Sequence, residues 1–221
     1  MAENRQKSWD AVWDEEGGES QIIQLGRSIY SFFYVKLIKK YSTSATDLVE
    51  LGCGTAAIAP LLKDTIHSYT GMDYSESAVG IATKKVTGIT GARIVCQDAL
   101  AIQPSQKNLY DIAWSAGLVE HFPNYEAIIR SHYDLVKSGG LVLIVVPYYY
   151  SYHLLWHVMT RPKFLRRFWP WEDTDFKLLT KKELLACGKR VEDSARVSFV
   201  PPSIVGLILG VLVLQIRKAT F

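Results

Sequence analysis

The sequence contains few of the features that assign a protein to a class at a glance, and cysteine is the clearest case. Its 221 residues include only 3 cysteines, Cys53, Cys96 and Cys187, which lie far apart and form no CxxC pair. This spacing disfavours a disulfide framework or a zinc site and favours reduced thiols in a cytoplasmic protein. His153 and His157 have the HxxxH spacing of one helix face, but no acid lies near them, so we expect no bound metal.

The net charge is also small, and long apolar runs are few. The 25 Lys and Arg residues nearly balance 22 Asp and Glu residues, and the net charge of +3 does not indicate nucleic-acid binding, which usually needs a concentrated basic face. The apolar segment 203–216 is shorter than the ~20 residues of a membrane-spanning helix. We expect a terminal strand or a core helix there; the alternative is an element that faces a membrane or a partner. Residues 1–10 are polar, so we expect no signal peptide.

What the chain does contain is enough apolar sequence for one α/β domain. Hydrophobic residues make up 48% and charged residues 21%, the proportions of a globular rather than a disordered chain. Strands are predicted at 47–51, 68–73, 92–96, 110–115 and 141–146, and helices at 22–41, 56–62, 75–86 and 125–136. This alternation predicts a doubly wound, mostly parallel sheet. In the last third, a capping box at Thr180 and Glu183 predicts a helix to Ala186 that Gly188 ends, followed by a strand at 191–200.

The first strand, turn and helix have the arrangement of a nucleotide-sized site. Asp47–Leu51 is predicted as a short buried strand, Gly52–Thr55 as a tight turn, and Ala56–Leu62 as the start of a helix. Glycine lets the backbone approach a ligand closely, and the first N–H groups of a helix have no partner within it. Glu50, two residues before Gly52, favours a ligand that carries positive charge over a pyrophosphate.

This stretch resembles a known family. Glu50–Ala56 reads E-L-G-C-G-T-A, similar to the E/D-x-G-x-G-x-G turn of class I S-adenosylmethionine-dependent methyltransferases, with Ala56 in place of the last glycine. Dinucleotide-binding proteins share these glycines, so a nicotinamide-dependent oxidoreductase is an alternative. The resemblance implies a Rossmann-like methyltransferase fold with a sheet of the seven-stranded type, and S-adenosylmethionine as cofactor. It also implies that Glu50, Gly52, Cys53 and Gly54 bind this cofactor.

Acids at two further strand ends extend the resemblance. Asp73 closes the second strand and is placed to accept hydrogen bonds from both hydroxyls of a ribose. The neighbouring Tyr74 is expected to line the adenine face. Asp98 follows the third strand at the position where the family has an acid that accepts from the adenine amino group, with Ala99 behind the ring. For each acid alone, a solvated loop residue is the alternative.

The fourth strand leads to the expected reacting end of the site. The resemblance implies that Ser115, Ala116 and Gly117 meet the methionine end of the cofactor, and it matches the family's Glu-His pair at Glu120 and His121. His121 is the lead candidate for a general base, with a structural histidine as the alternative.

Two segments outside this core are expected to bind the substrate and cover the cofactor. We expect a single methyltransferase domain over 1–221, with an N-terminal helical lid (1–41), a cofactor-binding core (47–147), an aromatic-rich helical substrate cap (148–178) and a C-terminal helix and strands (179–221). In the lid, Trp13 is the expected cofactor contact. In the cap, the candidate substrate-binding residues are Tyr148, Tyr149, Tyr152, His153 and His157. Aromatic packing without a binding role is the alternative for both segments.

Together, these features predict methyl transfer from S-adenosylmethionine to a small, largely apolar or aromatic acceptor, by in-line displacement at an O, N or C nucleophile, as in small-molecule biosynthesis. Besides the oxidoreductase, a non-catalytic cofactor-binding protein with a membrane-facing tail is an alternative. We expect no nucleic-acid partner; peripheral membrane contact is the less favoured alternative to a purely small-molecule partner.

Overall fold

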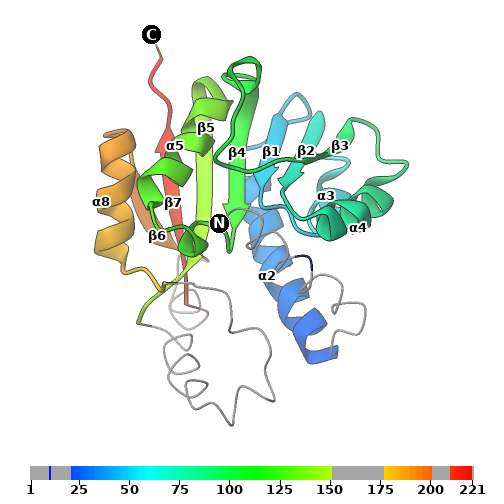
Figure 1. Ribbon diagram of the computed structural model, residues 1–221, viewed down its shortest axis with the longest axis horizontal. Coiled ribbons are helices and arrows are strands. Elements are labelled where there is room, and N and C mark those ends of the chain that lie inside the picture. The colour runs from blue at the N-terminus through cyan, green and yellow to red at the C-terminus, as the bar shows by residue number, and fades with distance from the viewer. Residues whose placement is uncertain (1–9, 11–20, 151–176, 201–209, 221) are drawn as a thin grey trace.

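A computed structural model describes residues 10, 21–150, 177–200 and 210–220. Its centre is a seven-stranded sheet with the strand order β3-β2-β1-β4-β5-β7-β6 (Figure 1). The strands are β1 Asp47–Leu51, β2 Ser68–Asp73, β3 Ala92–Cys96, β4 Tyr110–Ala116, β5 Val136–Pro147, β6 Arg196–Phe199 and β7 Val211–Arg217. The helices are α2 Gln21–Lys39, α3 Ala59–Leu62, α4 Glu76–Val86, α5 Tyr125–Leu135 and α8 Lys181–Val191, with 3-10 turns η2 Pro104–Gln106 and η3 Val119–His121.

The order of the strands positions a ligand site. Strands β1 to β5 are parallel to one another, while β7 is antiparallel to both β5 and β6. The chain builds outward from β1 to β3 and then returns to the other side of β1 with β4, so the order reverses between β1 and β4. In open α/β sheets, ligands bind at such a reversal, beyond the carboxyl ends of the strands. The predicted doubly wound, mostly parallel sheet is therefore confirmed.

Two hydrophobic layers cover the two faces of the sheet. Because successive side chains of a strand point to opposite faces, Val142, Ile144 and Val146 of β5 pack in the layer with α5 and α8. Their neighbours Leu143 and Val145 pack in the other layer, with α2, α3 and α4. Nearly every one of these side chains is fully buried, as expected for the centre of a parallel sheet.

Several predicted boundaries were wrong, and each error has a local cause. Helix α8 begins at the predicted capping box of Thr180 and Glu183 but continues through Gly188 to Val191. A Cβ atom at Gly188 would lie 2.7 Å from Leu214 Cδ1, so this glycine permits close packing inside the helix rather than ending it. The strand expected at 191–200 is correspondingly shorter. Helix α3 begins only at Ala59, since Ala56 has a φ of +51°, outside the helical region.

The C-terminal apolar segment belongs to the sheet where it is described. Strand β7 pairs with β5 along its whole length and is buried from Val211 to Leu214, which matches the expected terminal strand. Residues 203–209 of that segment lie outside the described residues. Among the helices that the structure describes, none is long and apolar enough to cross a bilayer.

Most of the expected cap and the first part of the expected lid fall outside the described residues, which omit 1–9, 11–20 and 151–176. The two ends of the cap segment are held together, because the Tyr149 N–H donates to the Leu179 carbonyl at 2.9 Å and Tyr148 forms a parallel bridge with Leu179. The division into lid, core, cap and C-terminal part stays a prediction.

Candidate functional site

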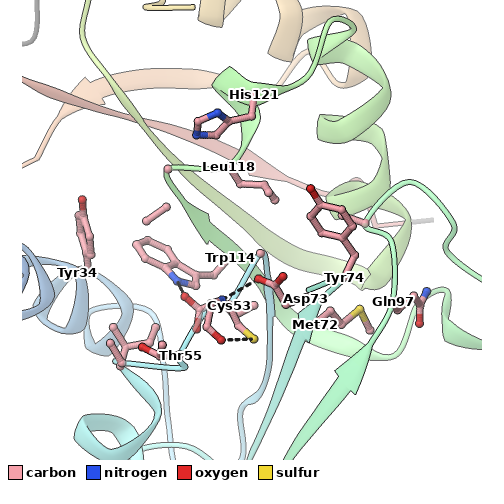
Figure 2. A pocket seen from close by; sticks show the side chains of 18 of the residues that line it. Tyr34, Cys53, Thr55, Met72, Asp73, Tyr74, Gln97, Trp114, Leu118 and His121 are labelled. Atoms are coloured by element: carbon pink, nitrogen blue, oxygen red, sulfur yellow. Dashed lines mark hydrogen bonds between the residues drawn. The ribbon is translucent and has the colours of Figure 1, made fainter. Parts of the chain in front are cut away.

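A cavity of about 560 Å³ opens at the carboxyl edge of the sheet, where the strand order reverses. This volume suits a small molecule. Figure 2 shows the side chains of Tyr34, Asp73, Tyr74 and His121 arranged around it. The lining residues are Tyr30, Ser31, Tyr34, Glu50, Gly52, Cys53, Gly54, Thr55, Ala57, Ile58, Met72, Asp73, Tyr74, Gln97, Asp98, Ala99, Leu100, Trp114, Ala116, Gly117, Leu118, His121 and Phe122.

Most of the residues predicted for the site lie around this one cavity. They are Glu50, Gly52, Cys53, Gly54, Asp73, Tyr74, Asp98, Ala99, Ala116, Gly117 and His121. Ser115 is fully buried behind the cavity wall. Tyr148 and Tyr149 follow β5 and are not among the lining residues. The remaining candidates, Trp13, Tyr152, His153 and His157, lie outside the described residues.

The glycine turn needs glycine at two positions. Gly52 and Gly54 have φ angles of +63° and +50°, in the left-handed region that side chains disfavour. At Gly52 an added Cβ would also lie 2.6 Å from Leu118 Cδ1. The turn after β1 therefore packs directly against the segment after β4, which brings the two halves of the cavity wall together.

Asp73 connects the end of β2 to this turn. Its Oδ2 accepts from the Gly54 N–H at 2.8 Å and its Oδ1 from the Ser75 N–H at 3.0 Å. Burial raises the pKa of Asp73, and the backbone N–H bonds oppose that shift. Because each carboxylate oxygen can accept more than one hydrogen bond, the side chain keeps acceptor capacity toward the cavity.

Glu50 is the most enclosed acid of the cavity wall. Its Oε1 accepts from Trp114 Nε1 at 2.9 Å, and its Oε2 accepts from the Tyr69 hydroxyl. Tyr34 of α2 packs on Trp114, with 5.3 Å between the ring centroids. Burial raises the pKa of Glu50 to about 7, although both hydrogen bonds favour the ionised form. A cationic ligand in the cavity would stabilise the carboxylate further.

A buried hydrogen-bonded pair holds the end of β4. His132 Nδ1 lies 2.7 Å from the Ile128 carbonyl, which can only accept, so this nitrogen carries the proton. His132 Nε2 then accepts from the Ser115 hydroxyl at 2.9 Å. Burial lowers the pKa of His132 to about 4, which keeps the ring neutral. Ser115 thus orients the strand end that carries Ala116 and Gly117.

Replacing Ser115 by alanine should destabilise the fold by roughly 1–3 kcal/mol, because it leaves the buried Nε2 of His132 without a hydrogen-bond donor. Chemical denaturation measures the difference. Ser131→Ala is the matched control: its hydroxyl donates only to the Ala127 carbonyl of its own helix, so a small change is expected. Equal effects of the two substitutions would contradict a special role for the Ser115–His132 pair.

Glu120 lies beside the cavity rather than on its wall. It is 4% exposed, and among the described residues its Oε2 is a buried oxygen without a hydrogen-bond partner. Its backbone carbonyl accepts from the Lys177 N–H at 3.0 Å. Burial raises the pKa of Glu120 to about 8. The neighbouring His121, in contrast, faces the cavity (Figure 2).

Sequence reasoning missed the aromatic side of the site. Tyr30 and Tyr34 come from α2, which the periodicity identifies only as an amphipathic helix. Trp114 lies in the central strand β4, and its register opposite Glu50 brings the indole to that carboxylate. The available signal was Trp114 itself, because a tryptophan in a central strand has an N–H group that needs a hydrogen-bond acceptor. Within the part of the chain that the structure describes, no three His, Cys, Asp or Glu side chains are grouped to hold a metal.

Comparison with known sequences finds similarity to methyltransferases over part of the chain. Residues 49–144 match the family described as Methyltransferase domain. A demethylmenaquinone methyltransferase from Staphylococcus epidermidis is 25% identical over 152 residues, which cover 65% of this chain and 62% of that protein. A ubiquinone biosynthesis O-methyltransferase from Nitrosomonas europaea is 28% identical over 102 residues, which cover 45% of this chain and 43% of that protein. The chain thus spans less than two thirds of the length of these relatives.

Solved structures share the fold at lower identity. A putative methyltransferase in complex with the Haloferax volcanii activator Trm112 has a TM-score of 0.67 at 13% identity, covering 98% of both chains. A possible histamine N-methyltransferase from Thermotoga maritima has a TM-score of 0.63 at 17% identity, covering 88% of this chain and 91% of its own. The [4+2]-cyclase SpnF also matches, with a TM-score of 0.62 at 18% identity, covering 85% of this chain and 81% of that protein. The fold alone therefore does not determine the reaction. Residues 49–144 are thus similar in sequence to a methyltransferase domain, and the chain shares its fold with S-adenosylmethionine-dependent methyltransferases of known structure.

Proposed function

We propose that the protein transfers a methyl group from S-adenosylmethionine to a small, largely apolar or aromatic acceptor. The observation that carries this proposal is the convergence of three acids from three neighbouring strands on one cavity: Glu50, Asp73 and Asp98. A donor with a positive charge and a ribose is complementary to this set. A nicotinamide dinucleotide is less complementary, because its negatively charged pyrophosphate would lie beside the Glu50 carboxylate.

The residues fit the donor in a definite orientation. Asp73 would accept from the ribose hydroxyls, and Tyr74, Asp98 and Ala99 would hold the adenine. The backbone of Gly52, Cys53 and Gly54 would approach the donor closely, since the turn leaves no side chain at either glycine. Ala116 and Gly117 would meet the methionine end of the donor. Ser115 would act through the strand end it orients, not by contact.

The main contribution of the protein to the reaction would be to position the acceptor relative to the methyl group. S-adenosylmethionine supplies a methyl group that its sulfonium already activates. The site must hold an acceptor in line with that methyl group and exclude water, a proximity effect that contributes about 7–11 kcal/mol. The rings of Tyr30, Tyr34 and Phe122 give the cavity an apolar wall for such an acceptor. His121 would take the proton from a hydroxyl acceptor.

Two of the relatives support an aromatic, lipophilic acceptor. One is named for demethylmenaquinone and another for ubiquinone biosynthesis. For this chain we infer an acceptor of the hydroquinone or phenol class. Incubation with methyl-labelled S-adenosylmethionine and a short-chain demethylmenaquinol tests the reaction; a panel of phenols, amines and carbon acids tests the acceptor class. Donor binding without transfer to any member of the panel would favour a non-catalytic cofactor-binding protein.

Replacing Asp73 by alanine should raise the dissociation constant of S-adenosylmethionine by tenfold or more, since one hydrogen bond to a charged group contributes roughly 1.5–3 kcal/mol. Calorimetric titration measures it, with NAD as a second ligand. The exposed Asp64 offers the matched control, and Asp64→Ala should bind as the unmodified protein does. Unchanged affinity in Asp73→Ala, or tight NAD binding by the unmodified protein, would overturn the assignment.

A further inference from the structure

The outer face of α2 combines exposed apolar and basic side chains in one line. Ile29 and Phe32 are 45% and 62% exposed, and Lys36, Lys39 and Lys40 are exposed further along the chain. Steps of three and four residues place them on one side of the helix and its C-terminal end. We call these five residues the outer face of α2. Large apolar side chains at such exposure usually have a partner when they are adjacent.

The same helix forms a wall of the cavity on its other side. Tyr30 and Tyr34 line the cavity, and Ile38 is fully buried in the core. The position of α2 is therefore set by its inner face, and within the described residues the outer face stays exposed. The 19 residues of α2 include no acid, so its lysines are not neutralised from within the helix.

We propose that the outer face of α2 docks the protein on the surface of an anionic phospholipid bilayer. Apolar residues followed by lysines along one face are the pattern of a helix that lies in the interface, with its apolar side chains among the acyl chains and its lysines at the headgroups. Lysine stems are long enough to keep the ammonium at the headgroups while Phe32 enters more deeply. The charge of the lysines is complementary to anionic lipid.

The position of α2 in the fold supports this docking. Figure 1 shows its N-terminal half extending past the edge of the sheet where the strands next to the cavity end. Tyr149 and Tyr150 follow β5 at that edge and are 37% and 63% exposed. Tyrosine is enriched at membrane interfaces. Ile29 and Phe32 precede the lysines along α2, so the apolar end of the outer face lies toward this edge, and docking there would bring the cavity near the bilayer surface.

A lipid surface fits this face better than a second protein chain does. A stable protein interface buries about 800 Å² on each partner, from roughly 20 residues or more. Two large apolar residues and three lysines are too few for that, but they suffice for reversible attachment to a charged bilayer.

Vesicle flotation of the intact protein tests the proposal. Binding to vesicles of phosphatidylcholine with phosphatidylglycerol should exceed binding to phosphatidylcholine alone and should fall as salt rises. Since one lysine near an anionic surface changes affinity roughly fivefold, the variant Lys36→Gln/Lys39→Gln/Lys40→Gln should bind about a hundredfold more weakly. Phe32→Ser should lose about tenfold or more.

Matched controls lie on other elements of the chain, in α4, before β4 and in α8. Lys84→Gln/Lys107→Gln/Lys189→Gln removes the same charge, and Leu109→Ser removes an apolar side chain that is 45% exposed. Both should keep the binding of the unmodified protein. Equal losses in the control and test variants, binding that ignores anionic lipid, or self-association through Phe32 in sedimentation would overturn the proposal. The assay needs neither donor nor acceptor, so its result is independent of the proposed methyl transfer.

Discussion

Replacing His121 by alanine should slow methyl transfer about a hundredfold or more, the usual contribution of a general base, while leaving the affinity for S-adenosylmethionine unchanged. The ring faces the cavity from η3, directly after the strand end expected to meet the methionine part of the donor. Proton removal is required only as the acceptor attacks, so loss of the base would lower the rate of the chemical step. Single-turnover measurements with the donor bound in excess isolate that step.

Two comparisons separate a base from a structural histidine. His121→Gln keeps a hydrogen-bonding side chain but cannot take up the proton, so it should be as slow as His121→Ala. Added imidazole should restore part of the rate of the alanine variant only. The exposed His67 is the control, and His67→Ala should be as fast as the unmodified protein. A normal single-turnover rate in His121→Ala would rule out the base role.

The fold was predictable because it depends on local patterns that the sequence states directly. Strands alternate with helices along the chain. Once a strand is predicted, the acid that lies at its end can be identified directly from the sequence. The capping box shows the same: Thr180 pairs with Glu183, as the residue types predict. Placing Asp73 near the glycine turn needed only the knowledge that parallel strands end at a common edge.

The features that were missed depend on partners far away in the chain. Tyr34 reaches the cavity because α2 packs across β1 and β4, and helical periodicity shows which face is buried but not what it meets. Ser115 looks like a lining residue by position, yet its hydroxyl is committed to His132 from α5. Gly188 looks like a helix stop until Leu214 is seen to occupy the space beside it. Each of these required tertiary contacts.

Replacing Glu120 by glutamine should change how stability depends on pH. The carboxyl has a pKa of 4.5 in the unfolded chain and about 8 in the folded protein. Between these values the folded protein holds a proton that the unfolded chain has released, so the free energy of unfolding falls as pH rises. At 1.36 kcal/mol for each pKa unit, the loss across this window is roughly 5 kcal/mol. Glu120→Gln has no such group, and its stability relative to the unmodified protein should rise from pH 4.5 to 8.

Other buried groups titrate in the same range, so the difference between the two proteins is the quantity to measure. Glu50, with its pKa raised to about 7, also weakens the fold as pH rises from 4.5. His132 acts in the opposite direction: its pKa falls from 6.5 to about 4 on folding, so its contribution is lost as pH falls through that window. Both groups are present in the variant and cancel in the comparison.

Denaturant unfolding of both proteins at several pH values between 4 and 9 gives this difference directly. The slope is informative even if the glutamine amide packs poorly and lowers stability by a constant amount at every pH. Proton exchange on unfolding is a second measure: near pH 6 the unmodified protein should release about one proton more than Glu120→Gln. Parallel stability curves and equal proton release would mean that the Glu120 carboxyl is ionised in the folded protein. A cation or a hydrogen-bond donor would then have to reach its Oε2, the atom for which the described residues supply no partner.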